Sequence, residues 1–227
     1  MRLILVAALL ASPAAAAERS FSVTSFDRIR VEGPFVVTVA TGKAVSARVS
    51  GDDAAIERVS LRVEGRTMLI RPNLSSWGGY PGKSAGAPRI MLTTPDLSTA
   101  ILIGSGSLDI DKMKGMRITL TAEGSGRITV HQLDADNASL AIAGAGALEV
   151  SGKARQAAAV ARGTAEIRAG DLIVSDLTLT TESAGAVRIQ ASRSAKVSAM
   201  GIGAVEVTGG AACEVKQTGG GPVRCGR

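Results

Sequence analysis

The segment GSGSLDI at residues 104–110 decides the fold, because six later segments repeat its pattern. Each copy reads small–x–small–x–aliphatic–x–apolar. The first small positions are Gly104, Gly124, Gly144, Gly163, Ser183, Gly201 and Gly219. Successive copies begin 20, 20, 19, 20, 18 and 18 residues apart. Self-similarity at a fixed period is typical of a repeat architecture, so it is interpreted before any single residue.

Each repeat is predicted to contain two short strands joined at a glycine corner. Apolar residues alternate with polar ones after the corner, which is the period of a strand. A second alternating stretch precedes each corner, with an apolar residue four positions before the first small one: Ala100, Leu120, Leu140, Ala159, Leu179, Val197 and Val215. Glycine suits the corner because it adopts positive φ without steric cost.

A unit of this size cannot bury its own apolar face, but stacked copies can. Equivalent strands would pair about 4.8 Å apart, with a short, irregular third side between the end of one unit and the start of the next. We therefore expect an all-β fold, a right-handed parallel β-helix with coils of 18–20 residues. The outward column supports the stacking, because opposite charges are neighbours at Glu149/Arg168, Arg188/Glu206 and Glu206/Arg224.

Other architectures of similar period fit less well. The chain lacks the L-x-x-L-x-L pattern and helical return of a leucine-rich repeat, and the recurring aspartate of a calcium-binding nonapeptide roll. Its five aromatic residues are too few for the girdles of a membrane barrel. No helix is expected after the Gly-x-Gly pairs, which excludes a dinucleotide fingerprint.

Residues 1–17 are predicted to be a signal peptide. Arg2 precedes an apolar run from Leu3 to Leu10, and Ala15–Ala17 form a small-residue cleavage site. The run is too short to span a membrane, and we expect no transmembrane segment in the mature chain. The mature protein would be one domain, 18–227, with a less regular β-rich part at 18–97 and regular coils at 98–227. It would be exported to the periplasm or cell surface, and a nucleic-acid partner is excluded because no basic run occurs.

The N-terminal part is expected to contain six strands, with a long loop before the last of them. The strands are Ile29–Val31, Phe35–Val39, Ala47–Val49, Leu61–Val63, Met68–Ile70 and Ile90–Leu92. The loop Asn73–Pro88 is rich in Gly, Pro and Ser and holds Trp77 and Tyr80. Since loops of this length are often functional and binding energy concentrates in Trp, Tyr and Arg, Trp77 and Tyr80 are the candidate binding residues. Alternatively, Trp77 folds back as a lid on the core.

These segments resemble the head GIN domain family, also labelled as an auto-transporter adhesin. The resemblance rests on Ile29–Val37 (IRVEGPFVV), on the turn Gly51–Asp53 before a short helical piece, on Leu69-Ile70 before the Trp-containing loop, and on Ile103–Leu108 (IGSGSL). It covers nearly the whole mature chain. It implies an envelope or surface protein with a β-helix-like fold. No membrane-embedded translocator domain is expected after Arg227, which is a departure from an autotransporter.

One group of residues could carry chemistry. His131 is the sole histidine, and the repeat register places it next to Asp111 on the third side, with Asp134 and Asp136 nearby. A polysaccharide lyase or hydrolase on a β-helix scaffold is therefore the alternative function. Glycoside hydrolysis needs two carboxylates at a defined separation. Alternatively, these residues are solvent-exposed turn residues without a catalytic role. No cofactor is expected. One His and two Cys are too few ligands for zinc, whereas calcium bound by turn aspartates stays open.

Cys213 and Cys225 both fall on inward-facing positions of the last repeat. An even number of cysteines in an exported protein favours a disulfide, which would lock the final coil; two buried free thiols are the alternative. The main hypothesis for function is a non-enzymatic structural or binding protein of the cell envelope, adhesin-like. Its partner would be an envelope glycan or protein of unknown identity.

Overall fold

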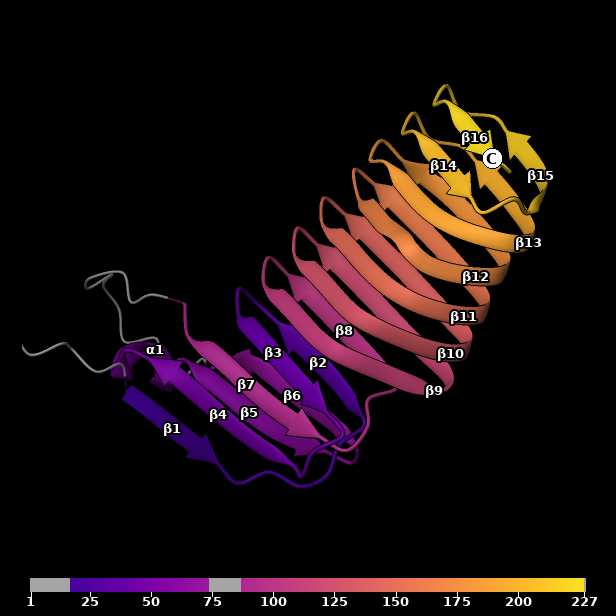
Figure 1. The fold of residues 1–227 in the computed structure, drawn as a ribbon. Coiled ribbons are helices and arrows are strands. Elements are labelled where there is room, and N and C mark those ends of the chain that lie inside the picture. The colour runs from indigo at the N-terminus through magenta and orange to yellow at the C-terminus, as the bar shows by residue number, and fades with distance from the viewer. Residues whose placement is uncertain (1–16, 74–86, 227) are drawn as a thin grey trace, which may run out of the picture.

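The computed structural model describes residues 17–73 and 87–226, and these form an elongated all-β protein with one short helix (Figure 1). Trp77, Tyr80 and most of the predicted signal peptide lie outside the described residues. The elements before the regular coils are β1 Ala17–Phe21, β2 Arg28–Glu32, β3 Val36–Thr41, β4 Ser46–Gly51, α1 Asp53–Glu57, β5 Val59–Glu64, β6 Thr67–Pro72 and β7 Arg89–Thr94. The later elements are β8 Thr99–Gly104, β9 Ser107–Gly124, β10 Arg127–Gly144, β11 Ala147–Gly163, β12 Glu166–Ser183, β13 Val187–Ala199, β14 Val205–Thr208, β15 Ala212–Gln217 and β16 Val223–Cys225.

The repeats form a parallel β-helix, as predicted. Equivalent residues of successive repeats pair directly, so Leu108 faces Ile128 and Ile128 faces Leu148. The columns predicted from the sequence line one interior: Leu148 and Val150 are 0% and 2% exposed. Burying each aliphatic side chain of this size contributes roughly 1.5–3 kcal/mol, so the stacked columns supply the main stabilisation of the coils.

The glycine corners are where successive coils come closest. Gly144 has φ +111°, and a Cβ atom there would lie 2.3 Å from the carbonyl oxygen of Gly124 in the preceding coil. Both the backbone conformation and the contact therefore favour glycine. Ser183 replaces glycine in one corner and uses its hydroxyl instead, donating to the Ala165 carbonyl at 2.8 Å and accepting from the Gly185 amide at 3.0 Å.

The third side differs from the prediction, because it is not irregular. Each of β9 to β12 continues through it as one long strand that bends from one glycine corner to the next (Figure 1). The ladder persists there: Leu133 pairs with Met113, and both are fully buried. Register shifts interrupt the pairing, for example between Val130 and Leu133. Such bulges bend a strand, which is how one strand turns the corner without a loop.

The N-terminal part assembles its first coil out of sequence order. β2 pairs in parallel with β8, and β3 pairs in parallel with β9, so the β2–β3 corner stacks beneath the Gly104 corner. The Ser107 amide donates to the Phe35 carbonyl at 2.8 Å across this junction. All six predicted N-terminal strands are confirmed.

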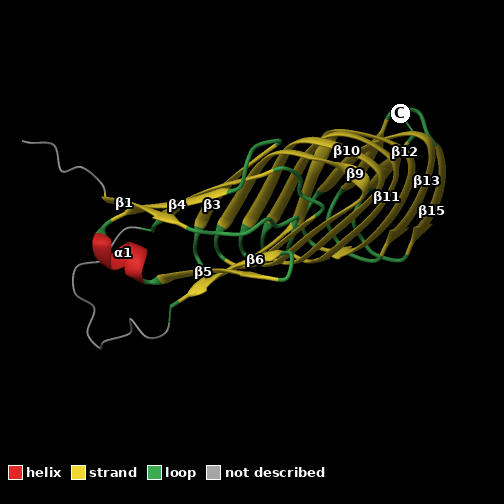
Figure 2. Ribbon diagram, turned by 90° about the horizontal axis from the view of Figure 1, so that it is seen from below, coloured by secondary structure: helices red, strands yellow, loops and turns green. Residues whose placement is uncertain are grey.

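Beyond this first coil, two sheets extend separately toward the N-terminal end (Figure 1). One adds β7, β4 and β1, and the other adds β6 and β5, with β1, β4 and β5 antiparallel to their neighbours. Figure 2 shows α1 at the end of the two sheets. Its Ala55 and Ile56 are 1% and 4% exposed, so the helix closes this end of the interior.

The C-terminal end is open by comparison. β15 has one neighbouring strand, β13, among the described residues, and every residue of β15 is exposed. Val215 is 43% exposed, whereas Val197, its equivalent in the preceding coil, is 2% exposed. The interior column therefore reaches the surface at the last coil.

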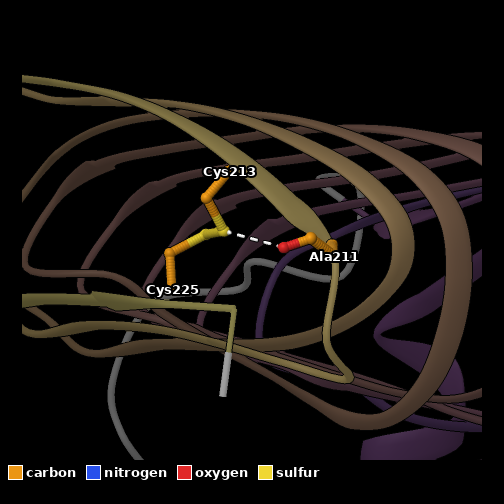
Figure 3. The surroundings of a disulfide bond; sticks show 3 residues. All are labelled: Ala211, Cys213 and Cys225. Atoms are coloured by element: carbon orange, nitrogen blue, oxygen red, sulfur yellow. Dashed lines mark hydrogen bonds between the residues drawn. A yellow bond between two sulfur atoms is a disulfide. The ribbon is translucent and has the colours of Figure 1, made fainter.

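The predicted disulfide is confirmed. Cys213 on β15 is bonded to Cys225 on β16, with 6.1 Å between the two Cα atoms (Figure 3). The Sγ atom of Cys213 also lies 3.4 Å from the carbonyl oxygen of Ala211. The bond joins the two faces of the last coil, but it is not in a sealed interior, because Cys213 is exposed and Cys225 only partly covered. The described part of the chain contains no helix with the length and hydropathy needed to cross a membrane.

Candidate functional site

The register places His131 beside Asp111, as predicted, because Val130 faces Ile110 and Gln132 faces Lys112. The hydrogen bond of the histidine, however, goes to another residue. The Nε2 atom of His131 lies 3.0 and 3.2 Å from the two carboxylate oxygens of Asp109, its diagonal neighbour on β9. Asp111 instead accepts hydrogen bonds from the amide and hydroxyl of Thr41, at 2.9 and 3.1 Å. Because Thr41 ends β3, on the side of β9 away from β10, the Asp111 carboxylate is drawn away from the histidine.

Asp134 and Asp136 are each engaged by cations of adjacent coils. Asp134 lies between Lys114 and Lys153, with N–O distances of 3.9 and 3.8 Å. Asp136 lies 3.8 Å from Arg155. These are exposed pairs worth at most about 1 kcal/mol each, and we interpret them as ladder contacts between coils. In the described part of the chain, no three His, Cys, Asp or Glu side chains are arranged to hold a metal ion.

Most charged side chains in the outward column of the coils are paired with opposite charges of neighbouring coils. Arg168 pairs with Glu149 at 2.9 Å, and Arg188 pairs with Glu206 at 3.1 Å, which confirms two of the predicted charge pairs. The hydrogen bonds that Arg168 donates to Glu166 and Glu149 raise its pKa. Glu206 and Arg224 are neighbours in the register without a salt bridge between them. This face therefore offers little uncompensated charge to a partner.

The outer face of β5 and β6 is different, because it forms a shallow open groove. Its lining consists of Ser60, Arg62, Glu64, Leu69, Arg71, Pro72 and Asn73. The alternation of β6 explains how it forms: Met68 and Ile70 point into the core and are fully buried, so Leu69 between them points outward. The groove thus contains an outward-pointing apolar residue, Leu69, among polar side chains of β5 and β6.

Leu69 is only 6% exposed although it points away from the core. The register places Arg62 of β5 opposite it on one side and Arg30 of β2 on the other. Arginine covers apolar surface with its aliphatic stem while its guanidinium stays in water. We therefore attribute the burial of Leu69 to these two arginines, which leaves their charged ends flanking an apolar floor.

The charges of this face are only partly balanced. The outward residues of β2, β5 and β6 include four arginines and two glutamates: Arg28, Arg30, Arg62, Arg71, Glu32 and Glu64. Glu32 is shared by Arg30 at 2.5 Å and Arg71 at 3.0 Å. These arginines, Arg30 above all, lower the pKa of Glu32 against the opposing effect of burial. Arg62 has no ion-pair partner within residues 17–73 and 87–226.

An arginine with spare donors beside an apolar strip can recognise an anionic ligand that also has an apolar face. Guanidinium groups bind carboxylate and phosphate oxygens through two parallel hydrogen bonds. Sequence reasoning missed this groove. The alternation Arg28-x-Arg30 signals an outward basic pair, but the pairing of β2 with β6, and hence the place of Leu69 between two arginines, is not local information.

Comparison with known proteins supports the fold and identifies the family. No curated protein matches the chain in sequence. A "putative adhesin" from Bacteroides fragilis has the same fold, with TM-score 0.81, 18% identity, and 93% of this chain and 97% of that one covered. A "putative lipid binding protein" from Parabacteroides distasonis has a TM-score of 0.70 and 21% identity, with 92% of this chain and 96% of that one covered. A "putative adhesin" from Parabacteroides merdae has a TM-score of 0.72 and 16% identity, with 92% of this chain and 95% of that one covered.

At these identities the structural likenesses establish the fold alone. The family model described as "Putative auto-transporter adhesin, head GIN domain" matches residues 25–211. That range includes most of the N-terminal part and six of the seven corners. The chain therefore belongs to the head GIN domain family.

Proposed function

We propose that this protein is an exported, non-catalytic binding module of the cell envelope, adhesin-like, which holds an anionic envelope polymer in the β5–β6 groove. The observation that carries the proposal is Arg62, an arginine without an ion-pair partner in the described chain, beside the buried outward Leu69. The candidate contact residues Trp77 and Tyr80 belong to the same proposal. They follow Asn73, the last described residue before them and part of the groove lining, by four and seven positions.

A carboxylated polysaccharide fits the groove best. Its carboxylates would accept hydrogen bonds from Arg62 and Arg71, while the apolar face of a sugar ring would lie on Pro72 and on the arginine stems that cover Leu69. A phosphate headgroup would satisfy the same donors. One structural relative is named a lipid-binding protein, so the binding test includes an anionic lipid surface as a separate outcome.

Export is supported by two independent features. The first 17 residues have the charge, apolar run and small-residue end of a signal peptide. A disulfide persists in oxidising compartments. Cleavage after Ala17 would leave Glu18–Phe21 to pair with β4, since Glu18 faces Ser50 and Phe21 faces Ala47. Mass spectrometry of the protein recovered from the periplasm should find Glu18 at its N-terminus; a retained Met1 would contradict export by this route.

A non-catalytic role is supported by the contacts of the candidate acidic residues. Glu32 and Asp176 are in addition unsuited to act as general acids, which need a raised pKa, because arginines lower the pKa of both. His131 is exposed and bonded to Asp109, and Asp111 is bonded to Thr41. We expect no cleavage when the mature protein is incubated with acidic and neutral polysaccharides. Reproducible cleavage that is lost in Asp109→Ala, Asp111→Ala or Asp134→Ala would favour the lyase or hydrolase instead.

The binding test uses three immobilised probes: polygalacturonate, neutral dextran and phosphatidylglycerol vesicles. The mature protein should bind polygalacturonate and not dextran, and Arg62→Ala should weaken binding by about five- to thirtyfold, which corresponds to a loss of about 1–2 kcal/mol. Arg117→Ala is the matched control, because Arg117 is an exposed arginine of β9 without a salt bridge in the described chain. Equal loss in both variants would indicate non-specific charge attraction and contradict a specific groove.

Trp77 is tested separately. Trp77→Ala should weaken polygalacturonate binding by at least about 1 kcal/mol, as expected for an aromatic contact residue, and leave the melting temperature nearly unchanged. Lower stability with unchanged binding would instead identify Trp77 as a lid on the core. Vesicle binding without polygalacturonate binding would redirect the proposal to a lipid headgroup.

A further inference from the structure

The last coil leaves an interior surface and a strand edge uncovered. β15 pairs with β13 on one side, and β16 pairs with β14 on one side; no described strand lies on the other side of either (Figure 1). The outer edge of β15 thus presents backbone amide and carbonyl groups without a strand partner. Such an edge is a template for another strand.

Apolar side chains are exposed around the same end. Val215 continues a column whose earlier members, Leu179 and Val197, are 1% and 2% exposed, yet it is 43% exposed itself. Met200 and Ile202 lie in the corner directly beneath the last one, where a Cβ on Gly219 would come within 2.6 Å of Met200. Their exposed fractions are 45% and 73%. An apolar surface at an unpaired edge indicates a contact with another molecule.

We propose that this end pairs with the same end of a second copy, through antiparallel pairing of the two β15 strands about Val215. A two-fold axis makes an interface self-complementary, so each strand must match itself when reversed. The sequence Cys-Glu-Val-Lys-Gln at 213–217 meets this requirement, because residues of opposite charge stand on the two sides of Val215. With Val215 opposite Val215 of the partner copy, Glu214 faces the partner's Lys216 and Lys216 faces the partner's Glu214.

Neighbouring registers are unfavourable. A shift of one residue would turn the apolar face of one strand against the polar face of the other. Centring the pair on Glu214 would place two glutamates opposite each other, and centring it on Lys216 would do the same with two lysines; like charges directly opposite are destabilising. Lys216 has no salt bridge within the described residues, while Glu214 lies 3.6 Å from Lys196 of its own chain.

The other end of a second copy is not a matching partner. There α1 closes the interior with Ala55 and Ile56, and the edge strands β1 and β5 belong to two sheets that have separated (Figure 2). A head-to-tail stack would bring the open column of Val215 against this closed end. The self-pairing end is also separate from the proposed ligand groove, which lies on the outer face of β5 and β6.

Charge reversal provides the test, read out by sedimentation equilibrium of mature protein over a concentration series. The unmodified protein should dimerise. Lys216→Glu places a glutamate against Glu214 at both contacts of the dimer without touching the Lys196 contact, and Glu214→Lys places lysines against lysines. Since two opposite-charge pairs become like-charge pairs, each variant alone should raise the dimer Kd by about tenfold or more.

Mixing the two variants should restore the dimer, because every facing pair is then opposite in charge. This recovery separates loss of pairing from loss of folding. Lys43→Glu is the control: it changes the charge equally on an exposed residue of the β3–β4 connection and should leave the Kd unchanged. A monomeric unmodified protein, a head-to-tail polymer, or a Lys216→Glu variant that dimerises normally would each overturn the proposal.

Discussion

At the N-terminal end the interior is sealed by α1 and by antiparallel strands, whereas at the C-terminal end the repeat continues to the last coil and its interior lies open. Ile56 is 4% exposed at the first end and Val215 is 43% exposed at the second. A stack of identical coils always has an unsatisfied face, so closure requires a departure from the repeat. The irregular N-terminal part makes that departure, and its extra strands β5 and β6 also create the candidate groove.

The largest loss of stability is expected when a corner glycine of the regular coils is replaced. Replacing a turn glycine of the N-terminal part should cost less. Gly144→Ala combines a φ of +111° with a Cβ 2.3 Å from the Gly124 oxygen, and should cost about 3–5 kcal/mol of unfolding free energy. Gly65→Ala in the β5–β6 turn has φ +62° and no atom within 4 Å, so about 1 kcal/mol is expected. Denaturant titration measures both.

Gly170→Ala is the matched control for these substitutions. A Cβ atom at Gly170 would meet no other atom within 4 Å, and the φ of this residue is not positive. Its replacement should therefore change the unfolding free energy by less than about 0.5 kcal/mol. If Gly144→Ala were as mild as Gly170→Ala, the coils would be less tightly stacked at the corners than the structure indicates.

The second effect compares the two ends directly. Ile56→Ala removes a buried side chain from the N-terminal closure and should cost about 3 kcal/mol. Val215→Ala removes a side chain that is already half in water and should cost less than about 1 kcal/mol in the monomer. Thermal and denaturant unfolding at low protein concentration measures both. Equal losses would show that the two ends are equally closed.

The third effect concerns the disulfide, the covalent closure of the open end. In the loop-closure model, a ring of this size contributes about 3 kcal/mol, and the loss on reduction should fall mainly on the last coil. Hydrogen exchange should therefore accelerate first in β15 and β16 after reduction, while α1 keeps its protection. Uniform acceleration along the chain would contradict a local role for Cys213–Cys225.

The smallest effect is a pH dependence in the coils near the C-terminal end. Hydrogen bonds from Arg193 and Ser194 lower the pKa of Asp176 to about 2 from an ordinary value of 3.8. A lowered pKa stabilises the folded state above pH 4, and this stabilisation is lost as the pH falls from about 4 to about 2. The stability difference between the native protein and Asp176→Asn should therefore shrink over that interval; a constant difference would show that the ion pair contributes nothing.

The repeat made the coils predictable. Alternation and period identified the corners and the columns through Leu148 and Val150, and the two cysteines fell on the last coil. The third side was not predictable in the same way. Met113, Leu133 and Leu172 are fully buried there, and each stands nine residues after the first small residue of its corner. In the coil that begins at Gly144, however, a bulge shifts the register, and Gly152 takes the equivalent place one residue earlier. The apolar position therefore does not recur in every coil.

The candidate site depended on contacts that sequence spacing does not encode. His131 reached Asp109 rather than Asp111 because Thr41, seventy residues earlier in the chain, holds Asp111. The groove needs β2 beside β6 so that Arg30 and Arg62 flank Leu69. These are pairings between strands that are distant in the sequence, and only the assembled N-terminal part brings them together.

The most direct test of ligand binding in the groove is hydrogen exchange of the mature protein with and without polygalacturonate. We predict added protection confined, among the described residues, to β2, β5 and β6, and lost in Arg62→Ala. Protection centred on β9 and β10 around His131 and Asp109, or no protection at saturating ligand, would contradict it.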